Sequence, residues 1–255
     1  AELIVESALH EPSLSDDQRV NGLMIAASTL VNEERYEKAI AALEPVGGYT
    51  DDPLQNARAH EALARAVSGD GSGLGDPRVL DEFIKAADLR LGVDPEARSP
   101  GSLRVFRKLV TQARRDPRQE IGYEYVKHAA DLFAPPEARR NEYGGYFLLH
   151  ASQMAEEMGD TDRAIGYLDQ LIEQYPDFQS DDLYMGFAPS FQVRRARLRE
   201  GVRMGEPNGA VVEVMFEVIN NPAYRKMPII YSFSYNVAYY YSELGMYDLS
   251  LDILL

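Results

Sequence analysis

Apolar residues recur at three- and four-residue intervals along most of the chain, in segments separated by short polar or Gly- and Pro-containing stretches. Leu23, Ala26, Ala27 and Leu30 show this spacing, which places apolar side chains on one face of an α-helix. No segment of alternating apolar and polar residues predicts a strand. The predicted helices cover about 1–10, 15–32, 34–46, 53–68, 77–91, 102–115, 117–133, 137–158, 161–175, 181–203 (interrupted near Pro189), 207–220 and 229 onward.

Local signals mark several helix starts. Ser15 followed by Gln18 is a capping-box pattern, in which the two residues satisfy each other's backbone amides. Asp76-Pro77 and Asp116-Pro117 also predict helix openings. The Asp accepts from free first-turn amides, and the Pro lacks only an amide that would be unpaired there.

The junction between two consecutive helices recurs six times, at a spacing of roughly 42 residues. Helices joined by so few residues pack as antiparallel pairs, and a period of this length is typical of stacked repeats that bury their apolar faces against each other. Aligned on the fifth residue after each junction begins, the junctions give Ala39, Leu80, Glu120, Ala164, Ala210 and Ser250. The fifth junction is predicted at Gly205.

The fourth pair resembles the tetratricopeptide repeat through Leu148, Ala151, Ser152, Ala155, Gly159, Ala164, Leu168, Leu171 and Pro176. Parts of the first and last pairs match less completely, and the period exceeds the family's 34 residues, so a HEAT-like array is the competing label. The small residue at the start of the second helix favours the tetratricopeptide label, and we expect Ala164 to lie against Ser152 or Ala155.

We therefore predict an all-α protein, a right-handed α-α superhelix (solenoid) of about six antiparallel helix hairpins that forms a single domain over 1–255. Apolar stripes at both ends, through Leu3 to Leu9 and through Leu251 to Leu255, predict that the sequence is a piece of a longer chain. Such uncovered ends predict self-association, because terminal repeats normally carry a polar outer face.

Charge and composition narrow the partner classes. The formal net charge is −15, which repels polyphosphate and argues against nucleic acid. The most apolar stretch, 227–244, is interrupted by polar residues and predicts no membrane span. Cysteine is absent, which excludes disulfides and thiolate chemistry. The compartment is not indicated.

Candidate chemistry is sparse, and we predict neither an enzyme nor a cofactor or metal. The histidines His10, His60, His128 and His150 fall in different predicted helices without metal-ligand spacing. The stretch 69–81 superficially resembles a calcium loop through Asp70, Ser72, Asp76 and Asp81, but Leu74 occupies a ligand position and the final residue is not Glu. A plain inter-helix loop is the preferred interpretation.

Basic residues cluster on two predicted first helices against the acidic background: Arg104, Arg107, Lys108, Arg114 and Arg115, and Arg194, Arg195, Arg197, Arg199 and Arg203. The resemblance implies that first helices line a concave face, which would place both clusters along one groove. Arginine pairs bidentately with carboxylates. Arg107, Arg194 and Arg197 are therefore candidate contacts for an acidic segment or a free carboxylate of a protein partner, and Asn236 matches an Asn that clamps a peptide terminus in some family members. A solvated helix face balanced by neighbouring acids is the alternative.

Tyrosines crowd the last pair, where Tyr231, Tyr235 and Tyr239 share one helix side. They are either packing residues or, for Tyr235 and Tyr239, partner contacts, because Tyr is enriched at interfaces. The predicted function is a non-catalytic scaffold or adaptor for protein-protein interaction. The alternative is a small-ligand or glycan-binding module that uses the Tyr-rich final hairpin, and an enzyme with a catalytic domain beyond the given ends ranks third.

Overall fold

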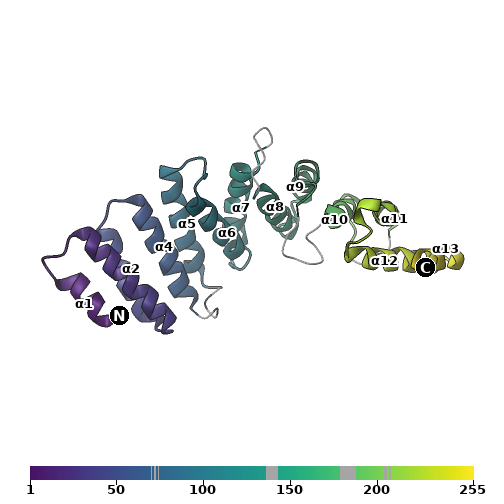
Figure 1. Cartoon of the computed structure of the whole chain (residues 1–255). Coiled ribbons are helices and arrows are strands. Elements are labelled where there is room, and N and C mark those ends of the chain that lie inside the picture. The colour runs from purple at the N-terminus through teal and green to yellow at the C-terminus, as the bar shows by residue number, and fades with distance from the viewer. Residues whose placement is uncertain are drawn as a thin grey trace. The chain divides into compact units, whose positions relative to one another are not determined.

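The computed structural model describes residues 1–69, 71, 73, 75–135, 143–178, 188–203, 206 and 208–255. Among these residues it has thirteen α-helices, two short 3-10 helices and no strand (Figure 1), which confirms the all-α prediction. Contacts divide the chain into two compact units, Ala1–Pro135 (unit 1) and Pro136–Leu255 (unit 2). The single domain and the right-handed superhelix stay predictions.

Unit 1 is a series of helices in which each one packs against the next along the chain. Its elements are α1 (Glu2–His10), α2 (Asp16–Asn32), α3 (Tyr36–Leu43), the 3-10 helix η1 (Glu44–Gly48), α4 (Pro53–Ser68), α5 (Pro77–Val93), α6 (Pro100–Ala113) and α7 (Gln119–Phe133). The predicted helix 34–46 ends early, at Leu43, because Pro45 has no amide to continue the α-helical ladder. Leu23 and Leu30 of α2 and Phe106 of α6 are among the fully buried side chains of unit 1.

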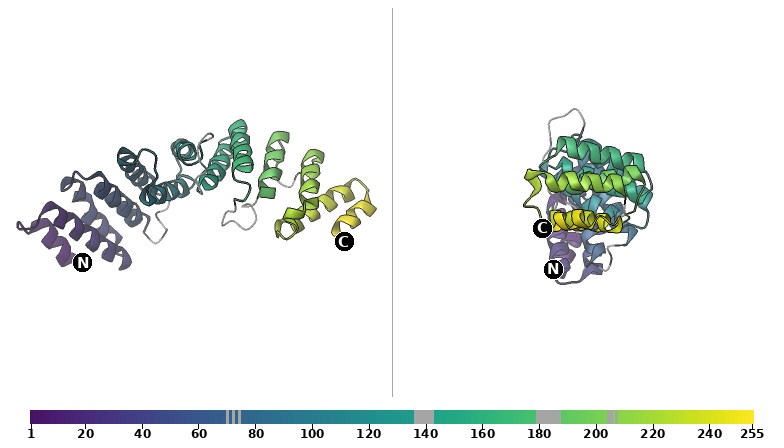
Figure 2. Two further views of the ribbon diagram at one scale, coloured as in Figure 1. Left: turned by 45° about the horizontal axis from the view of Figure 1, so that its top comes forward. Right: turned by 90° about the vertical axis from the view of Figure 1, so that its right-hand side faces the viewer.

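Unit 2 has the same serial packing, from α8 to α13. Its elements are α8 (Gly144–Glu157), α9 (Thr161–Gln174), α10 (Ala188–Glu200), α11 (Gly209–Asn220), the 3-10 helix η2 (Pro222–Tyr224), α12 (Ile229–Glu243) and α13 (Tyr247–Leu254). The green α10 and α11 and the yellow α12 and α13 can be followed in Figure 2. The predicted starts at 137 and 181 fall on residues outside the described ones. Pro189, near which an interruption was predicted, is the second residue of α10.

Two of the predicted helix openings are confirmed. The Ser15 hydroxyl accepts from the Gln18 amide at 3.3 Å, and the Gln18 side chain accepts from the Ser15 amide at 2.9 Å. Asp76 Oδ1 accepts from the Arg78 amide at 2.9 Å and caps α5. The Asp116 prediction was wrong by two residues, because its carboxylate accepts from both the backbone and the side chain of Arg118 and α7 begins only at Gln119.

Four first helices end in the same turn. Gly159, Gly201 and Gly245 have φ of 76°, 65° and 75°, and the amide of the residue after each bonds back to the carbonyl five residues earlier. This is the Schellman motif, which favours glycine because a left-handed residue has no room for a Cβ without strain. Glu34 occupies the equivalent position with a φ of 59°. Gly201 occupies this position in the fifth pair, and the predicted junction residue Gly205 lies outside the described residues.

Small residues allow close helix approach, although not always where the alignment placed them. Ala164, Ser152 and Ala155 are all fully buried on the packed pair α8 and α9. In the third pair the small residue is Gly122, where a Cβ would lie 2.8 Å from the Ala113 carbonyl oxygen. The sequence alignment had placed Glu120 at this small-residue position, because it assumed that α7 starts at 117. The helix starts two residues later, at Gln119. Ala210, the aligned residue of the fifth pair, is exposed.

The last helix, α13, contains no fully buried residue, and several of its apolar side chains are exposed. Leu251, Leu254 and Tyr247 are 56%, 55% and 69% exposed. Within the described residues, none of the helices has the length and apolar character needed to cross a membrane.

Candidate functional site

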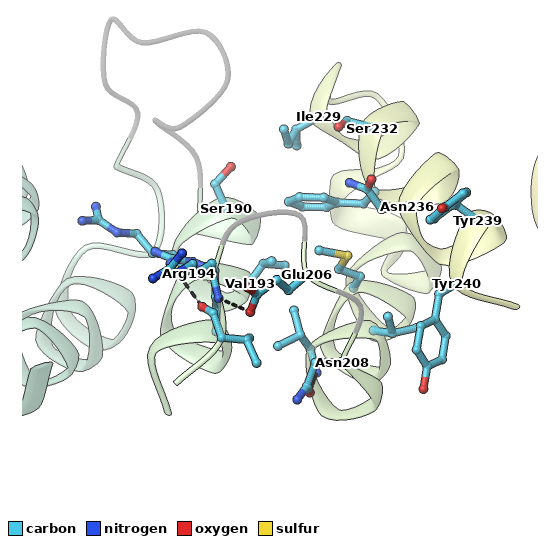
Figure 3. A pocket seen from close by; sticks show the side chains of 17 residues that line it. Ser190, Val193, Arg194, Glu206, Asn208, Ile229, Ser232, Asn236, Tyr239 and Tyr240 are labelled. Atoms are coloured by element: carbon cyan, nitrogen blue, oxygen red, sulfur yellow. Dashed lines mark hydrogen bonds between the residues drawn. The ribbon is translucent and has the colours of Figure 1, made fainter. Parts of the chain in front are cut away.

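A pocket of about 310 Å³ lies between α10, α11 and α12 in unit 2 (Figure 3). Its lining residues are Ser190, Val193, Arg194, Arg197, Val202, Arg203, Glu206, Asn208, Val211, Val212, Met215, Ile229, Ser232, Phe233, Asn236, Tyr239 and Tyr240. The floor is apolar, with Val193, Val212 and Phe233 nearly buried. The rim is open, because Arg203, Asn236 and Tyr239 are exposed.

Local sequence features set the three walls of the pocket. The left-handed Gly201 ends α10 and turns the chain toward α11. Asn208 caps α11 by accepting from the Val211 amide at 3.2 Å, which fixes Val211 and Val212 on the buried face. A Cβ at Gly209 would lie 3.1 Å from the Tyr240 hydroxyl, so glycine permits the close approach of α12.

Helix α12 contributes side chains both to the floor of the pocket and to its rim. Ile229 and Phe233 are buried, while Asn236 and Tyr239 follow at three-residue steps and are exposed. Figure 3 shows Asn236 and Tyr239 on the α12 side and Ser190 and Val193 on the α10 side. A bound segment would thus meet apolar side chains below and polar groups along the rim.

The two arginines in the pocket wall are anchored by one carboxylate. Glu156 of α8 accepts from Arg194 Nε at 2.8 Å and Nη2 at 2.5 Å, and also pairs with Arg197. Arg197 Nη1 donates to the Val202 carbonyl at 3.4 Å. Burial raises the pKa of Glu156, but hydrogen bonds and charges from Arg197 and Arg194 outweigh burial, so its pKa lies below the ordinary value.

The remaining α10 arginines divide between another partner and the rim. Arg195 and Arg199 pair with Asp169 of α9, at 2.8 Å and 3.0 Å. Arg203 forms no side-chain ion pair with a described residue, although its amide donates to Glu206 at 3.0 Å. Acidic residues of α8 and α9 therefore neutralise most of the arginine cluster on α10. For Arg195 and Arg199 this agrees with the alternative prediction, in which neighbouring acids balance a solvated helix face. Excess positive charge remains at the pocket.

The structure brings four of the predicted site residues to one pocket: Arg194, Arg197, Asn236 and Tyr239. Tyr235 does not line it and is 64% exposed elsewhere on α12. Arg107 is exposed on α6, in unit 1. The groove predicted to join its helix with α10 stays a prediction.

Sequence reasoning missed the apolar floor of the pocket. Val211, Val212 and Met215 belong to α11, whose segment 209–220 is rich in Val and carries apolar residues around the helix. That excess of apolar residues could have indicated a second apolar surface on this helix, because a helix with a single buried stripe needs fewer apolar residues.

The residues weighed for metal chemistry do not converge. Among the described residues there is no group of three or more His, Cys, Asp or Glu that would hold a metal ion. In the calcium-like stretch, Asp70, Ser72 and Leu74 lie outside the described residues, Asp76 caps α5 and Asp81 pairs with Arg118 at 3.0 Å. His60 Nδ1 lies 2.5 Å from Glu82 Oε2.

Comparison with known families adds one match. Residues 146–177 match the family model of the tetratricopeptide repeat, and this stretch covers most of α8 and all of α9. It is the pair in which the resemblance was most complete in the sequence, and it supplies Glu156, the anchor of the two pocket arginines. No curated protein matches the chain.

Proposed function

We propose that this tetratricopeptide-like helical repeat protein is a non-catalytic adaptor that binds a peptide segment of another protein in the pocket between α10, α11 and α12. Tetratricopeptide repeats are protein-interaction modules, and the family is generally non-catalytic. The observation that carries the proposal is the convergence of Arg194, Arg197, Asn236 and Tyr239 around one open apolar pocket.

The pocket chemistry favours a segment with an apolar side chain next to an acidic group. The apolar floor offers burial worth about 25 cal/mol per Å². At the wall and rim, Arg194, Arg197 and Arg203 carry three positive charges against the two carboxylates Glu156 and Glu206. A carboxylate of the partner would therefore meet a local positive excess, and Asn236 supplies an amide that hydrogen-bonds to a peptide backbone or terminus.

The test starts from the full chain and a phage-displayed random peptide library. A selected peptide is then titrated by fluorescence polarisation in its free-acid form, its amidated form and a form with Asp and Glu changed to Asn and Gln. The Asn236→Ala/Tyr239→Ala variant should weaken binding at least about tenfold, which corresponds to about 1.4 kcal/mol. Added salt should weaken it further.

The matched control is Tyr231→Ala, because Tyr231 is another exposed tyrosine of α12 and lies outside the pocket. Its affinity should stay within about twofold. Arg194 and Arg197 are left intact in this test, because changing either also breaks its ion pair with Glu156. If selected peptides bind the double variant and the parent equally, this pocket is not the peptide site.

A glycan-binding module is the second candidate, and one observation favours it. Tyr231, Tyr235 and Tyr239 are 80%, 64% and 53% exposed and follow one side of α12, so their rings are available to stack on sugar faces. Oligosaccharide titrations with the same variants separate the candidates. A glycan should lose affinity with both Tyr231→Ala and Tyr239→Ala and be indifferent to salt.

A further inference from the structure

A second pocket, of about 290 Å³, lies in unit 1 and is lined mainly by α2 and α4. Its lining residues are Met24, Ala27, Ser28, Val31, Asn32, Leu43, Arg58, Glu61, Ala62, Arg65 and Arg104. The α2 side is apolar or neutral. The α4 and α6 side carries three arginines and one glutamate, so the charge of this wall is positive.

The one glutamate already has two arginine partners. Glu61 is 3% exposed, and its Oε1 accepts from Arg90 Nη2 at 2.7 Å while its Oε2 accepts from Arg104 Nε at 3.1 Å. Arg104 Nη2 adds a longer bond to Oε1 at 3.3 Å. Burial raises the pKa of Glu61, but Arg104 and Arg90 outweigh burial and hold the pKa below its ordinary value. Glu61 is thus an ionised anchor whose two oxygens are both already paired with arginines.

The other cations around the pocket lack counter-ions. Arg58 and Arg65 are exposed and form no ion pair with a described residue. Lys108 lies one turn after Arg104 on α6, and its Nζ is buried without a hydrogen-bond partner in the described part of the chain, 5.9 Å from the Phe83 ring centre. A buried ammonium without a hydrogen-bond acceptor is costly.

The electrostatic neighbours of Lys108 are the charged residues of the pocket. Burial lowers the pKa of Lys108, Arg65 and Arg104 lower it further, and only Glu61 acts to raise it. In a chain with a net charge of −15, the five cations Arg58, Arg65, Arg90, Arg104 and Lys108 around the single carboxylate of Glu61 form an exception to the general charge balance.

We infer that this pocket, walled by Arg58, Arg65 and Arg104 with Lys108 beside it, is a binding site for a small polyvalent oxyanion of the phosphate or polycarboxylate class. Guanidinium groups bind such oxygens in pairs, and contacts between opposite charges are strongest where water is partly excluded. The volume is at the lower end of the range for small-molecule pockets, which suits a compact anion. The site lies in unit 1 and does not depend on the pocket proposed for peptides.

The experiment uses the full chain and three probes: inorganic phosphate, citrate and a tetraglutamate peptide with blocked ends. Each is titrated by isothermal calorimetry at constant ionic strength. In parallel, the Cε resonances of labelled lysines are followed as a function of pH. Lys38, Lys85, Lys127 and Lys226 are the other lysines of the chain and serve as internal references, and Lys108→Arg assigns the Lys108 signal.

Phosphate or citrate should bind and raise the pKa of Lys108, because a nearby anion stabilises the ammonium form. The Arg58→Gln/Arg65→Gln variant should weaken binding at least about tenfold. Neither residue forms an ion pair with a described residue, so the variant should fold normally, as thermal melting will check. The matched control is Arg225→Gln/Lys226→Gln, which removes the same charge from exposed residues of unit 2 and should leave the affinity within about twofold.

Phosphate binding in preference to citrate would identify a phosphate ligand, and the reverse a polycarboxylate. Equal weakening by both double variants would show a net-charge effect and overturn the site. Binding of the tetraglutamate peptide alone would overturn the small-anion assignment, and so would a Lys108 pKa unmoved by all probes. The Asn236→Ala/Tyr239→Ala variant should keep its anion affinity, which distinguishes failure of this site from failure of the peptide pocket.

Discussion

At the scale of single residues, small side chains decide how closely neighbouring helices approach. A Cβ at Gly122 would lie 2.8 Å from the Ala113 carbonyl oxygen and 3.1 Å from the Ala113 Cα. These are backbone atoms of α6, which cannot rotate away as a flexible side chain does. Gly166 on α9 is the opposite case, because a Cβ there meets no atom within 4 Å.

Gly122→Ala should lower the free energy of unfolding by about 1 to 3 kcal/mol, because overpacking forces α6 and α7 apart. Gly166→Ala should instead raise it by up to about 1 kcal/mol, because alanine restricts the unfolded chain and favours the helix. Urea unfolding followed by circular dichroism measures both. Stabilisation by Gly122→Ala would show that the approach of α6 and α7 is not as close as described.

At the scale of helices, single carboxylates join elements that are distant in sequence. Glu61 of α4 holds Arg90 of α5 and Arg104 of α6, and Glu156 of α8 holds two arginines of α10. In both cases a guanidinium is largely buried, since Arg90 is 6% and Arg194 is 9% exposed. Removing the carboxylate would leave a buried cation without its counter-ion, which is costly.

Glu156→Gln should therefore lower the free energy of unfolding at pH 7 by about 1 to 3 kcal/mol, with the lower part of that range favoured by partial exposure of the pair. Glu173→Gln is the control, because Glu173 is exposed on α9 without an ion pair to a described residue, and it should change stability by less than about 0.5 kcal/mol. Equal effects of the two changes would contradict an anchoring role for Glu156.

The same ion pairs set the direction of the pH dependence. The pKa of Glu156 in the folded chain lies below its ordinary value of 4.5. Its contribution is thus fully present above that value and is lost as the pH falls through the lowered pKa. The free energy of unfolding of the parent should decrease below about pH 4.5. Glu156→Gln should show a shallower decrease, because this variant lacks the ionised carboxylate, and therefore its contribution, already at pH 7. Thermal melts from pH 7 to pH 3 measure the difference.

At the scale of the whole molecule, the apolar surface of α13 has no covering element among the described residues. Leu251 and Leu254 are both more than half exposed, and α13 packs on α12. Grouped apolar side chains of this kind promote association.

We expect the chain to self-associate with rising concentration, and Leu251→Lys/Leu254→Lys to suppress that association. Sedimentation velocity over a wide concentration range provides the measurement. Ile25→Lys is the control, since Ile25 is 61% exposed but belongs to α2 of unit 1 and not to α13, and it should leave association unchanged. A parent that stays monomeric at every concentration would refute the prediction.

The sequence by itself determined the helices and their order. Apolar spacing, the Ser15–Gln18 capping box and the Asp76-Pro77 opening are interactions within a few residues, so the local chain specifies them without help from the fold. The repeat period and the tetratricopeptide resemblance at α8 and α9 followed from the same local patterns. The late start of α7 was missed because Asp116 binds Arg118 instead of capping a helix at Pro117.

Only the tertiary structure decided which charged residues meet and where the pockets lie. Glu156 reaches Arg194 across 38 residues, and Glu61 reaches Arg104 across 43. Nothing in the spacing of the arginines distinguishes Arg194, which is buried against Glu156, from Arg199, which is exposed beside Asp169. The packing of successive helices sets these distances, because the rotation and separation of each helix depend on the side chains that fill the space between it and its neighbours.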